Sequence, residues 1–138
     1  VALSALLGAV ETAAEAGDPV GSAHVDRGMS AVPWPCVPLG RVFALPRNRV
    51  RTLSRLVELA PEQRAPVGEC AARIAGEVDL TASTVERFLY ELAETGIVER
   101  VRVSDSDGPG RPPSRVDPRF PTLAFRRLAR RRTDGDPA

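Results

Sequence analysis

Polar side chains of the kinds that contact nucleic acid gather within residues 81–90 of this 138-residue chain. If the stretch is a helix, the small hydroxyls at its start lie beside backbone N–H groups without helical partners, and together these suit phosphate oxygens. The two-pronged guanidinium of Arg87, one turn further on, matches the edge of a guanine. The candidate contact residues of this stretch are Thr81, Ser83, Thr84, Arg87 and Tyr90.

A second candidate group lies in and beside the Gly- and Pro-rich stretch SDSDGPGRPPSR at residues 104–115. Glycine permits close approach to a backbone, and proline keeps the chain extended with little conformational entropy to lose. Arg111 is therefore suited to a narrow minor groove, where the negative potential is greatest, with Arg102 and Arg115 on the flanking phosphates. The alternative is a solvated hairpin tip.

Local structure offers another explanation for residues 81–90. Thr81 can cap a helix that starts at Ala82, or Ser83 can form a capping box with Glu86. The two longer side chains also have simple structural roles, because Tyr90 can pack on a neighbouring element and an i,i+4 ion pair is available between Arg87 and Glu91. We favour contact with DNA and keep these local roles as the alternative.

The basic charge is unevenly distributed along the chain. All 19 basic residues are Arg, and the net charge is only +1. Residues 100–132 hold ten Arg and three acids, a local charge of +7, whereas residues 47–99 hold seven Arg and nine acids, a local charge of −2. A local basic field is the usual footprint of a polyanion partner, and a solvated basic tail at residues 126–132 is the alternative.

Residue types for catalysis or metal binding are sparse. His24 is the only histidine, there is no Lys, and Cys36 and Cys70 cannot form a four-cysteine zinc site. We therefore expect no enzyme activity, no metal and no cofactor. Free, reduced thiols fit better than a disulfide, which favours a cytoplasmic location. No apolar run reaches the roughly 18 residues of a membrane span, and the first 14 residues lack the basic start of a secretory signal.

Three helices and a hairpin are predicted to position the candidate residues. An apolar stripe predicts a helix over 49–60 with Asn48 as its N-cap, a second helix begins at Pro66, and a third covers 82–94 before Gly96. Alternating β-branched residues predict a strand over 97–103, followed by a short edge strand within Ser114–Asp117. These elements make up a predicted domain over residues 47–120.

The flanking segments are predicted to be less regular. Residues 1–46 are expected to be an extension with one short helix over 1–16 and a linker rich in Gly and Pro. Residues 121–132 are expected to form a basic C-terminal helix whose final arginines favour the negative end of the helix dipole. Residues 133–138 are expected to be a disordered tail.

The run from Val67 to Val103 resembles the winged helix-turn-helix of bacterial and archaeal transcription regulators of the arsenic-resistance and multiple-antibiotic-resistance type. The resemblance covers about half of the chain. It differs by about four extra residues between Ile74 and Leu80, which either lengthen the second helix or loosen the turn. The matching residues are Thr81, Ser83, Thr84, Val85, Arg87, Leu89, Leu92, Gly96, Ile97 and Val98, and GRPP at Gly110–Pro113 resembles some wings.

The resemblance implies a mostly α fold with a small β-hairpin wing, a winged helix-turn-helix that binds double-stranded DNA as a homodimer. Helix 82–94 would read the major groove, and the 104–115 wing would contact the backbone and minor groove. The dimer surface is left open among residues 3–14, the helix at 49–60 and Leu123–Leu128. The main alternative is a winged-helix protein–protein interaction module in a replication, segregation or polymerase-associated assembly. Another is non-specific binding through the Arg-rich tail alone.

Overall fold

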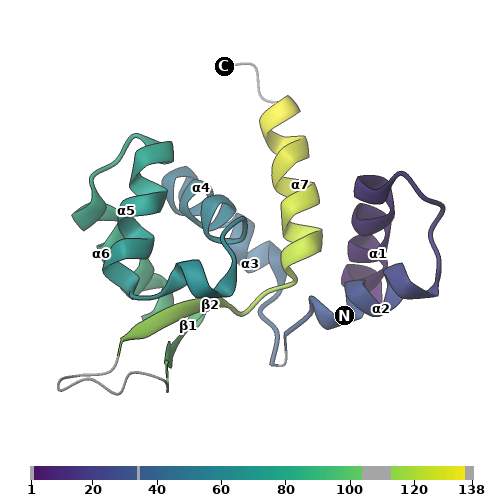
Figure 1. Cartoon of the computed structure of the whole chain (residues 1–138). Coiled ribbons are helices and arrows are strands. Elements are labelled where there is room, and N and C mark those ends of the chain that lie inside the picture. The colour runs from purple at the N-terminus through teal and green to yellow at the C-terminus, as the bar shows by residue number, and fades with distance from the viewer. Residues whose placement is uncertain (1, 34, 104–112, 136–138) are drawn as a thin grey trace. The chain divides into compact units, whose positions relative to one another are not determined.

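The computed structural model describes residues 2–33, 35–103 and 113–135, and the chain divides into two compact units (Figure 1). Unit 1 combines Val1–Arg41 with Phe120–Ala138, and unit 2 is the continuous segment Val42–Arg119. The described residues are mostly helical with one small two-stranded antiparallel sheet. The predicted class, mostly α with a small hairpin, is confirmed at that level.

Unit 2 contains the elements that position the candidate site. The short helix α3 (Leu39–Phe43) contains the boundary between the units. Within unit 2 the order is α4 (Arg47–Leu56), one 3-10 turn (Pro61–Arg64), α5 (Val67–Val78), α6 (Ala82–Glu94), β1 (Val98–Arg102) and β2 (Ser114–Pro118).

The core of unit 2 forms where the apolar stripes of its helices meet. The stripe predicted for the third helix is confirmed, because Val85, Phe88, Leu89 and Leu92 of α6 are all buried. They are joined by Leu53 and Leu56 of α4, by Val67, Cys70, Ala71, Ile74 and Val78 of α5, and by Ile97, Val98 and Val116 beside and within the hairpin. Burying an aliphatic side chain of this size contributes about 1.5–3 kcal/mol.

Both ends of α6 are fixed by local sequence. The Thr81 side chain accepts a hydrogen bond from the Thr84 N–H at 3.3 Å, so Thr81 is the N-cap rather than Ser83. At the other end Gly96 has φ +79°, and the Ile97 N–H donates to the Leu92 carbonyl at 3.0 Å. This is a Schellman closure, which needs the left-handed residue that glycine adopts without strain.

The extra residues before Leu80 lengthen α5 rather than loosen the turn. The helix runs through Gly76 to Val78, and Asp79 takes the left-handed conformation at φ 57°. Aspartate tolerates this conformation better than most residues, so the chain reverses at once and α6 starts three residues later. The turn between α5 and α6 is therefore tight.

The start of α4 differs from the prediction. Asn48 is not the N-cap, because the helix begins at Arg47 and the cap position is Pro46, without a side-chain cap. The carbonyl of Pro46 accepts from the Arg49 N–H at 2.9 Å and the Val50 N–H at 3.2 Å, so the first turn is already closed upstream. The helix also ends at Leu56, before the predicted residue 60.

The hairpin joins β1 and β2 in one antiparallel register, from Val98 opposite Pro118 to Arg102 opposite Ser114. Because side chains alternate along a strand, Val98, Arg100 and Arg102 share one face with Ser114 and Val116. The predicted edge strand is confirmed. The turn between the strands, residues 104–112, is outside the described residues.

Unit 1 is built from α1 (Ala2–Ala16), α2 (Ser22–Ser30) and α7 (Thr122–Gly135). The linker predicted over residues 17–46 is partly wrong, since α2 and α3 lie within it. Gly21 is the N-cap of α2, and its N–H donates to Nδ1 of His24 at 3.0 Å.

The helices α1 and α2 approach closely at Gly28. A Cβ on Gly28 would overlap the Ala5 carbonyl oxygen and lie 2.7 Å from the Ala9 nitrogen. Gly28 is therefore a contact glycine that brings the backbones of α1 and α2 together.

An ion-pair cluster joins α1 to α7. Glu11 is buried and accepts from Arg127 at 3.2 Å and from Arg130 at 2.6 Å, and Glu15 pairs with Arg126 at 3.1 Å. The helix continues to Gly135, so the predicted disordered tail is wrong for residues 133–135, and residues 136–138 are not described. The basic C-terminal segment is thus part of unit 1, joined to α1 by ion pairs of three of its arginines.

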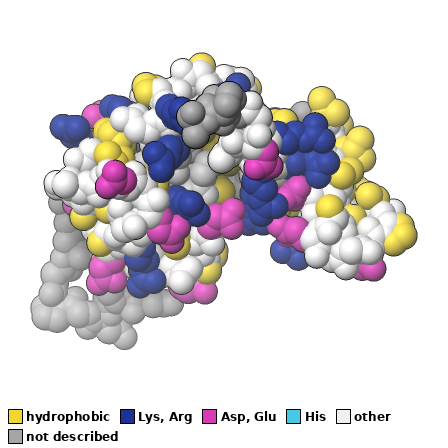
Figure 2. Space-filling view, turned by 90° about the horizontal axis from the view of Figure 1, so that it is seen from above, with side chains coloured by type: hydrophobic (Ala, Val, Ile, Leu, Met, Phe, Trp, Pro, Cys, Tyr) yellow, Lys and Arg dark blue, Asp and Glu magenta, His cyan; other side chains and the backbone are white. Residues whose placement is uncertain are grey.

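The exposed large hydrophobic side chains among the described residues all fall between residues 3 and 29. Leu3 is 79% exposed and Met29 61%, and the others are Leu6, Val20 and Val25. Figure 2 shows hydrophobic side chains on the surface over α1 and α2. Unit 1 therefore presents an apolar surface, which we call the α1–α2 surface.

Candidate nucleic-acid interface

The N-terminal turn of α6 carries a cluster of hydroxyl groups at the surface. Thr81 Oγ1 lies 2.8 Å from Thr84 Oγ1 and 3.2 Å from Ser83 Oγ, and Thr81 and Ser83 are exposed. Thr81 is therefore occupied as the cap, and Ser83 is the hydroxyl that presents an open side to solvent. The predicted hydroxyl residues are brought together at one helix end.

Arg87 projects from the next turn of α6 into solvent. Its side chain is 67% exposed, and its Nε lies 3.8 Å from Oε1 of Glu91, one turn away. At that exposure and distance the ion pair contributes little, because solvent screens it. The pairing expected as the local alternative is present, and it leaves most of the guanidinium accessible.

Arg49 of α4 occupies a position that the sequence did not indicate. Its guanidinium carbon lies 3.9 Å above the centre of the Phe88 ring, and its Nη2 donates to Oε2 of Glu91 at 3.1 Å. The ring and the carboxylate hold this arginine against α6. Glu91 is thus shared between two arginines.

A shallow groove of about 360 Å³ runs along the outward face of α6. Its lining is mixed in charge, with Arg87 beside three glutamates. Tyr90 donates its hydroxyl to Oε1 of Glu86 at 3.2 Å, so this carboxylate is engaged as well. The residues that line the groove are Ser83, Glu86, Arg87, Tyr90, Glu91 and Glu94.

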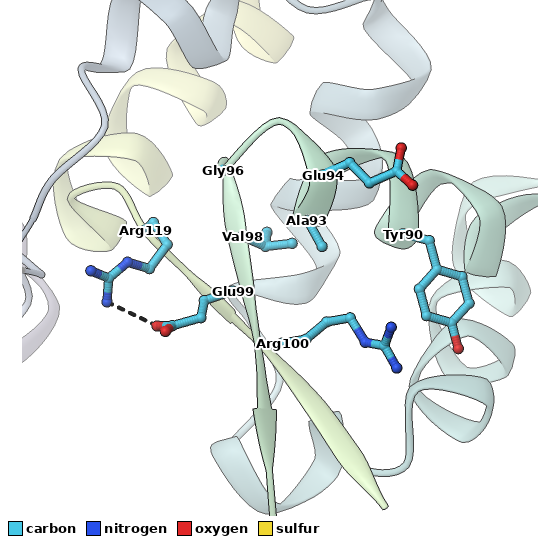
Figure 3. A pocket seen from close by; sticks show the side chains of 8 residues that line it. All are labelled: Tyr90, Ala93, Glu94, Gly96, Val98, Glu99, Arg100 and Arg119. Carbon is cyan, nitrogen blue, oxygen red and sulfur yellow. Dashed lines mark ion pairs between the residues drawn. The ribbon is translucent and has the colours of Figure 1, made fainter.

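Arg100 of β1 reaches the other side of Tyr90. Its guanidinium carbon lies 4.8 Å from the centre of the Tyr90 ring, and its Nη2 donates to Ser114 Oγ at 3.4 Å. Figure 3 shows Arg100 extending toward this ring, while the neighbouring Glu99 points the other way, to its ion pair with Arg119 at 3.1 Å. Sequence reasoning chose Arg102 and missed Arg100, although the two-residue period of a strand places them on one face.

A pocket of about 490 Å³ lies between the hairpin, Tyr90 and the first turn of α5. Arg100 and Arg102 both line it, and within the described residues neither has a carboxylate partner. No acidic side chain is among the described residues that line the pocket. We call it the arginine pocket; its lining residues are Pro66, Val67, Gly68, Tyr90, Arg100, Arg102, Pro113 and Ser114.

The remaining predicted arginines differ in their surroundings. Arg115 donates from Nε to both carboxylate oxygens of Asp117, at 2.9 and 3.1 Å, so its charge is compensated within the hairpin. Asp117 also lies 3.6 Å from Arg64, whose pKa is lowered mainly by burial and partly restored by Asp117. Arg111 lies outside the described residues.

A second pocket, of about 620 Å³, lies at the end of α6 and along β1 (Figure 3). It combines two glutamates with two arginines, so it has no net preference for an anion or a cation. Its charged lining residues are Glu94, Glu99, Arg100 and Arg119, and two of these four, Glu99 and Arg119, are already paired with each other. This pocket does not match the charge of a polyanion as the arginine pocket does.

Cys70 is buried inside unit 2 and Cys36 is half-buried, and both are free thiols. Burial raises the pKa of Cys70 to about 11, and the nearby Arg64 and Arg73 lower it only in part. A thiol protonated at neutral pH is a poor nucleophile, so its position is that of a small core residue.

No protein-family model, curated protein or solved structure matches this chain. Among the described residues, no three His, Cys, Asp or Glu side chains converge as a metal site would require. No described helix combines the length and hydrophobicity needed to cross a bilayer.

Proposed function

We propose that unit 2 is a winged helix-turn-helix domain that binds double-stranded DNA, and that the protein regulates transcription. In this proposal α5 and α6, with the tight turn at Asp79, are the helix-turn-helix, and the β1–β2 hairpin is the wing. The order of elements and the buried stripe of α6 support the proposal, because a recognition helix must be held by one face and present the other.

One observation carries the proposal. The outward face of α6 begins with exposed hydroxyls and Arg87, and Tyr90 on the same helix adjoins the arginine pocket, whose two arginines have no described carboxylate partner. Compensated arginines abound elsewhere, as in the cluster around Glu11. Uncompensated arginines beside an exposed helix start are the feature that a phosphate backbone would bind.

The C-terminal arginines give little support to binding through the tail alone. Arg126, Arg127 and Arg130 are engaged by Glu11 and Glu15 inside unit 1. The local charge of +7 counted along the sequence is therefore partly cancelled in space. We assign the contact with DNA to unit 2.

We also propose that the protein is a homodimer through the α1–α2 surface. Of the three candidate surfaces, the Leu123–Leu128 segment is mostly withdrawn, because Leu123, Ala124 and Phe125 are buried. The α1–α2 surface instead leaves Leu3 and Leu6 exposed, and several exposed apolar side chains on one unit are a candidate protein–protein contact. A symmetric dimer would place two recognition helices on one duplex.

The decisive experiment is selection of bound sequences from a random duplex pool at two salt concentrations. A two-fold-symmetric motif at both concentrations is expected of a dimeric regulator. A flat sequence profile with steep salt dependence contradicts sequence-specific regulation, because it is the behaviour of phosphate contacts without base contacts.

One observation favours the interaction module as a second candidate. The last turns of α6 present Glu91 and Glu94, and Glu86 lies one turn earlier, which is unfavourable next to phosphates. This candidate predicts no saturable duplex binding even at low salt. Recovery of bound duplexes at the lower salt concentration of the selection experiment therefore separates the two functions.

A further inference from the structure

We propose that the arginine pocket is a seat for one backbone phosphate of the duplex, bound by Arg100, Arg102, Ser114 and the first turn of α5. The inference rests on the proposed function, and it adds to it a binding site separate from the outward face of α6. The chemistry recognised is a phosphate group with two free oxygens. Its source here is the phosphodiester backbone of DNA.

The charge of the pocket is the first argument. Two arginines line it, and among its described lining residues there is no carboxylate to compensate them. Arg102 is exposed and pairs with none of the described acids, in contrast to Arg115 on the neighbouring strand, which Asp117 neutralises. Among the described residues, these two guanidinium groups without counter-ions give a local charge of +2, which phosphate oxygens would match.

The rigidity of Arg100 is the second argument. The Arg100 guanidinium contacts the Tyr90 ring at 4.8 Å and Ser114 Oγ at 3.4 Å, and these two contacts favour one orientation of the side chain. An arginine held in place before binding loses less side-chain entropy when the ligand arrives. Neither contact neutralises its charge, so both orient the group while leaving it able to bind an anion.

The first turn of α5 completes the seat. The position before the helix is Pro66, which provides no side-chain cap, so the leading N–H groups of α5 are not capped by it. Gly68 lines the pocket, and a Cβ built there meets nothing within 4 Å, so the backbone is open to close approach. The helix start adds donors and a positive partial charge to a site that the arginines already define.

Gly68→Glu tests the seat with little risk to the fold. It places a carboxylate in open space at the start of a helix, where acids are favourable, and at the same time repels phosphate. The matched control is Gly76→Glu, the same change of charge on the same helix at another exposed glycine with open space around it. Arg102→Gln removes one guanidinium directly.

The measurement is fluorescence anisotropy of a labelled 20-base-pair duplex over a series of salt concentrations. We expect Arg102→Gln and Gly68→Glu each to reduce the slope of log K against log salt by about 0.9, the loss of one phosphate contact, with Gly76→Glu close to wild type. Circular dichroism checks that each variant keeps its helical content.

The outcomes separate the seat from the proposed function. If the wild-type protein binds no duplex, the proposed function fails and the seat fails with it. If the wild-type protein binds but the slope is unchanged in both pocket variants, the seat alone is overturned. If inorganic phosphate titrated at millimolar concentration shifts the Val67 and Gly68 amide resonances while the duplex slope is unchanged, the pocket takes a small phosphate compound instead, which overturns the assignment to DNA.

Discussion

Arg49 of α4 donates to Glu91 of α6 across 3.1 Å, a hydrogen bond that joins the two helices through residues 42 positions apart in sequence. Because Arg49 takes the nearer carboxylate oxygen and also covers the Phe88 ring, Glu91 is oriented toward α4. Arg87 is left with the longer contact of 3.8 Å. Arg49 therefore makes the shorter ion pair with this acid of the proposed recognition helix, and Arg87, which we expect to read DNA, makes only the longer, exposed one.

Replacing Arg87 with alanine tests this role. Loss of a two-pronged base contact is expected to weaken binding to the selected motif by about 1–3 kcal/mol and to relax the preference at one base position. The measurement is competition binding against single-base variants of the motif. Arg51→Ala, an exposed arginine on α4, is the control and should leave the preference unchanged. An unaltered base preference in Arg87→Ala would show that α6 does not read sequence through this residue.

Thr81→Ala removes the N-cap of α6. The expected loss is about 0.5–2 kcal/mol in the free energy of unfolding, because the Thr84 N–H loses its side-chain acceptor. Urea denaturation followed by circular dichroism measures it. Ser83→Ala is the comparison and should change stability by less than about 0.5 kcal/mol, because Ser83 is exposed and its hydroxyl contacts the Thr81 hydroxyl at 3.2 Å without capping a backbone N–H. Equal losses in the two variants would contradict the single-cap assignment.

Gly28→Ala should separate α1 from α2. The added methyl group meets the backbone of Ala5 and Ala9, which cannot move aside as a flexible side chain would. Overpacking of this kind costs about 1–3 kcal/mol or more. Gly40→Ala is the control, since a Cβ there meets nothing within 4 Å. Thermal unfolding compares the two, and a wild-type melting temperature in Gly28→Ala would argue against the close helix contact.

The double variant Leu3→Ser and Leu6→Ser tests the homodimer. Each exposed leucine buried at an interface contributes up to about 1.5–3 kcal/mol, so the pair should shift the protein to monomer. Light scattering after size-exclusion chromatography gives the mass, and Ala14→Ser, an exposed change on the same helix, should leave it unaltered. A wild-type protein that is monomeric at high micromolar concentration rejects the proposed dimer.

The stability of unit 2 should fall at alkaline pH because of Cys70. Burial raises the pKa of its thiol from 9.0 to about 11, so folding favours the protonated form. The resulting stabilisation is complete below pH 9 and is lost as the pH rises toward 11. Urea midpoints measured from pH 8 to 11 should decline less in Cys70→Ala than in wild type. The chain contains no Lys, which removes the commonest other group that titrates there.

Periodicity and local signals located α5, α6 and the hairpin strands of unit 2, although the cap and bounds of α4 were predicted wrongly. Residues 82–94 were predicted as a helix from the stripe of Val85, Leu89 and Leu92, and α6 has these bounds. Such stripes repeat within one or two turns, so they can be recognised in a short window. The two candidate caps could not be separated in advance, because Thr81 and Ser83 have the same chemistry and only the backbone geometry decides between them.

Contacts between residues that are distant in sequence could not be predicted from local patterns. Gly28 looks like a helix breaker in isolation, and its role becomes clear only when Gly8 and Ala9 lie against it. In the sequence, the arginines of α7 contribute to an apparent basic field. In the structure, Glu11, more than a hundred residues away in sequence, accepts hydrogen bonds from Arg127 and Arg130. The position of Arg100 on the same strand face as Arg102 could have been predicted from the two-residue period of a strand. Its contact with Tyr90 could not, because that contact depends on how the hairpin packs against α6.

The discontinuity of unit 1 has a consequence for the order of events during synthesis. Glu11 leaves the ribosome before unit 2, whereas Arg127 and Arg130 follow only after the whole of unit 2 has been made. Unit 2 is continuous in sequence and can fold as soon as it emerges, because domains generally fold as units during translation. The N-terminal helices must wait for the C-terminal helix. Residues of α1 that pair with α7 are therefore made long before the partners that complete unit 1.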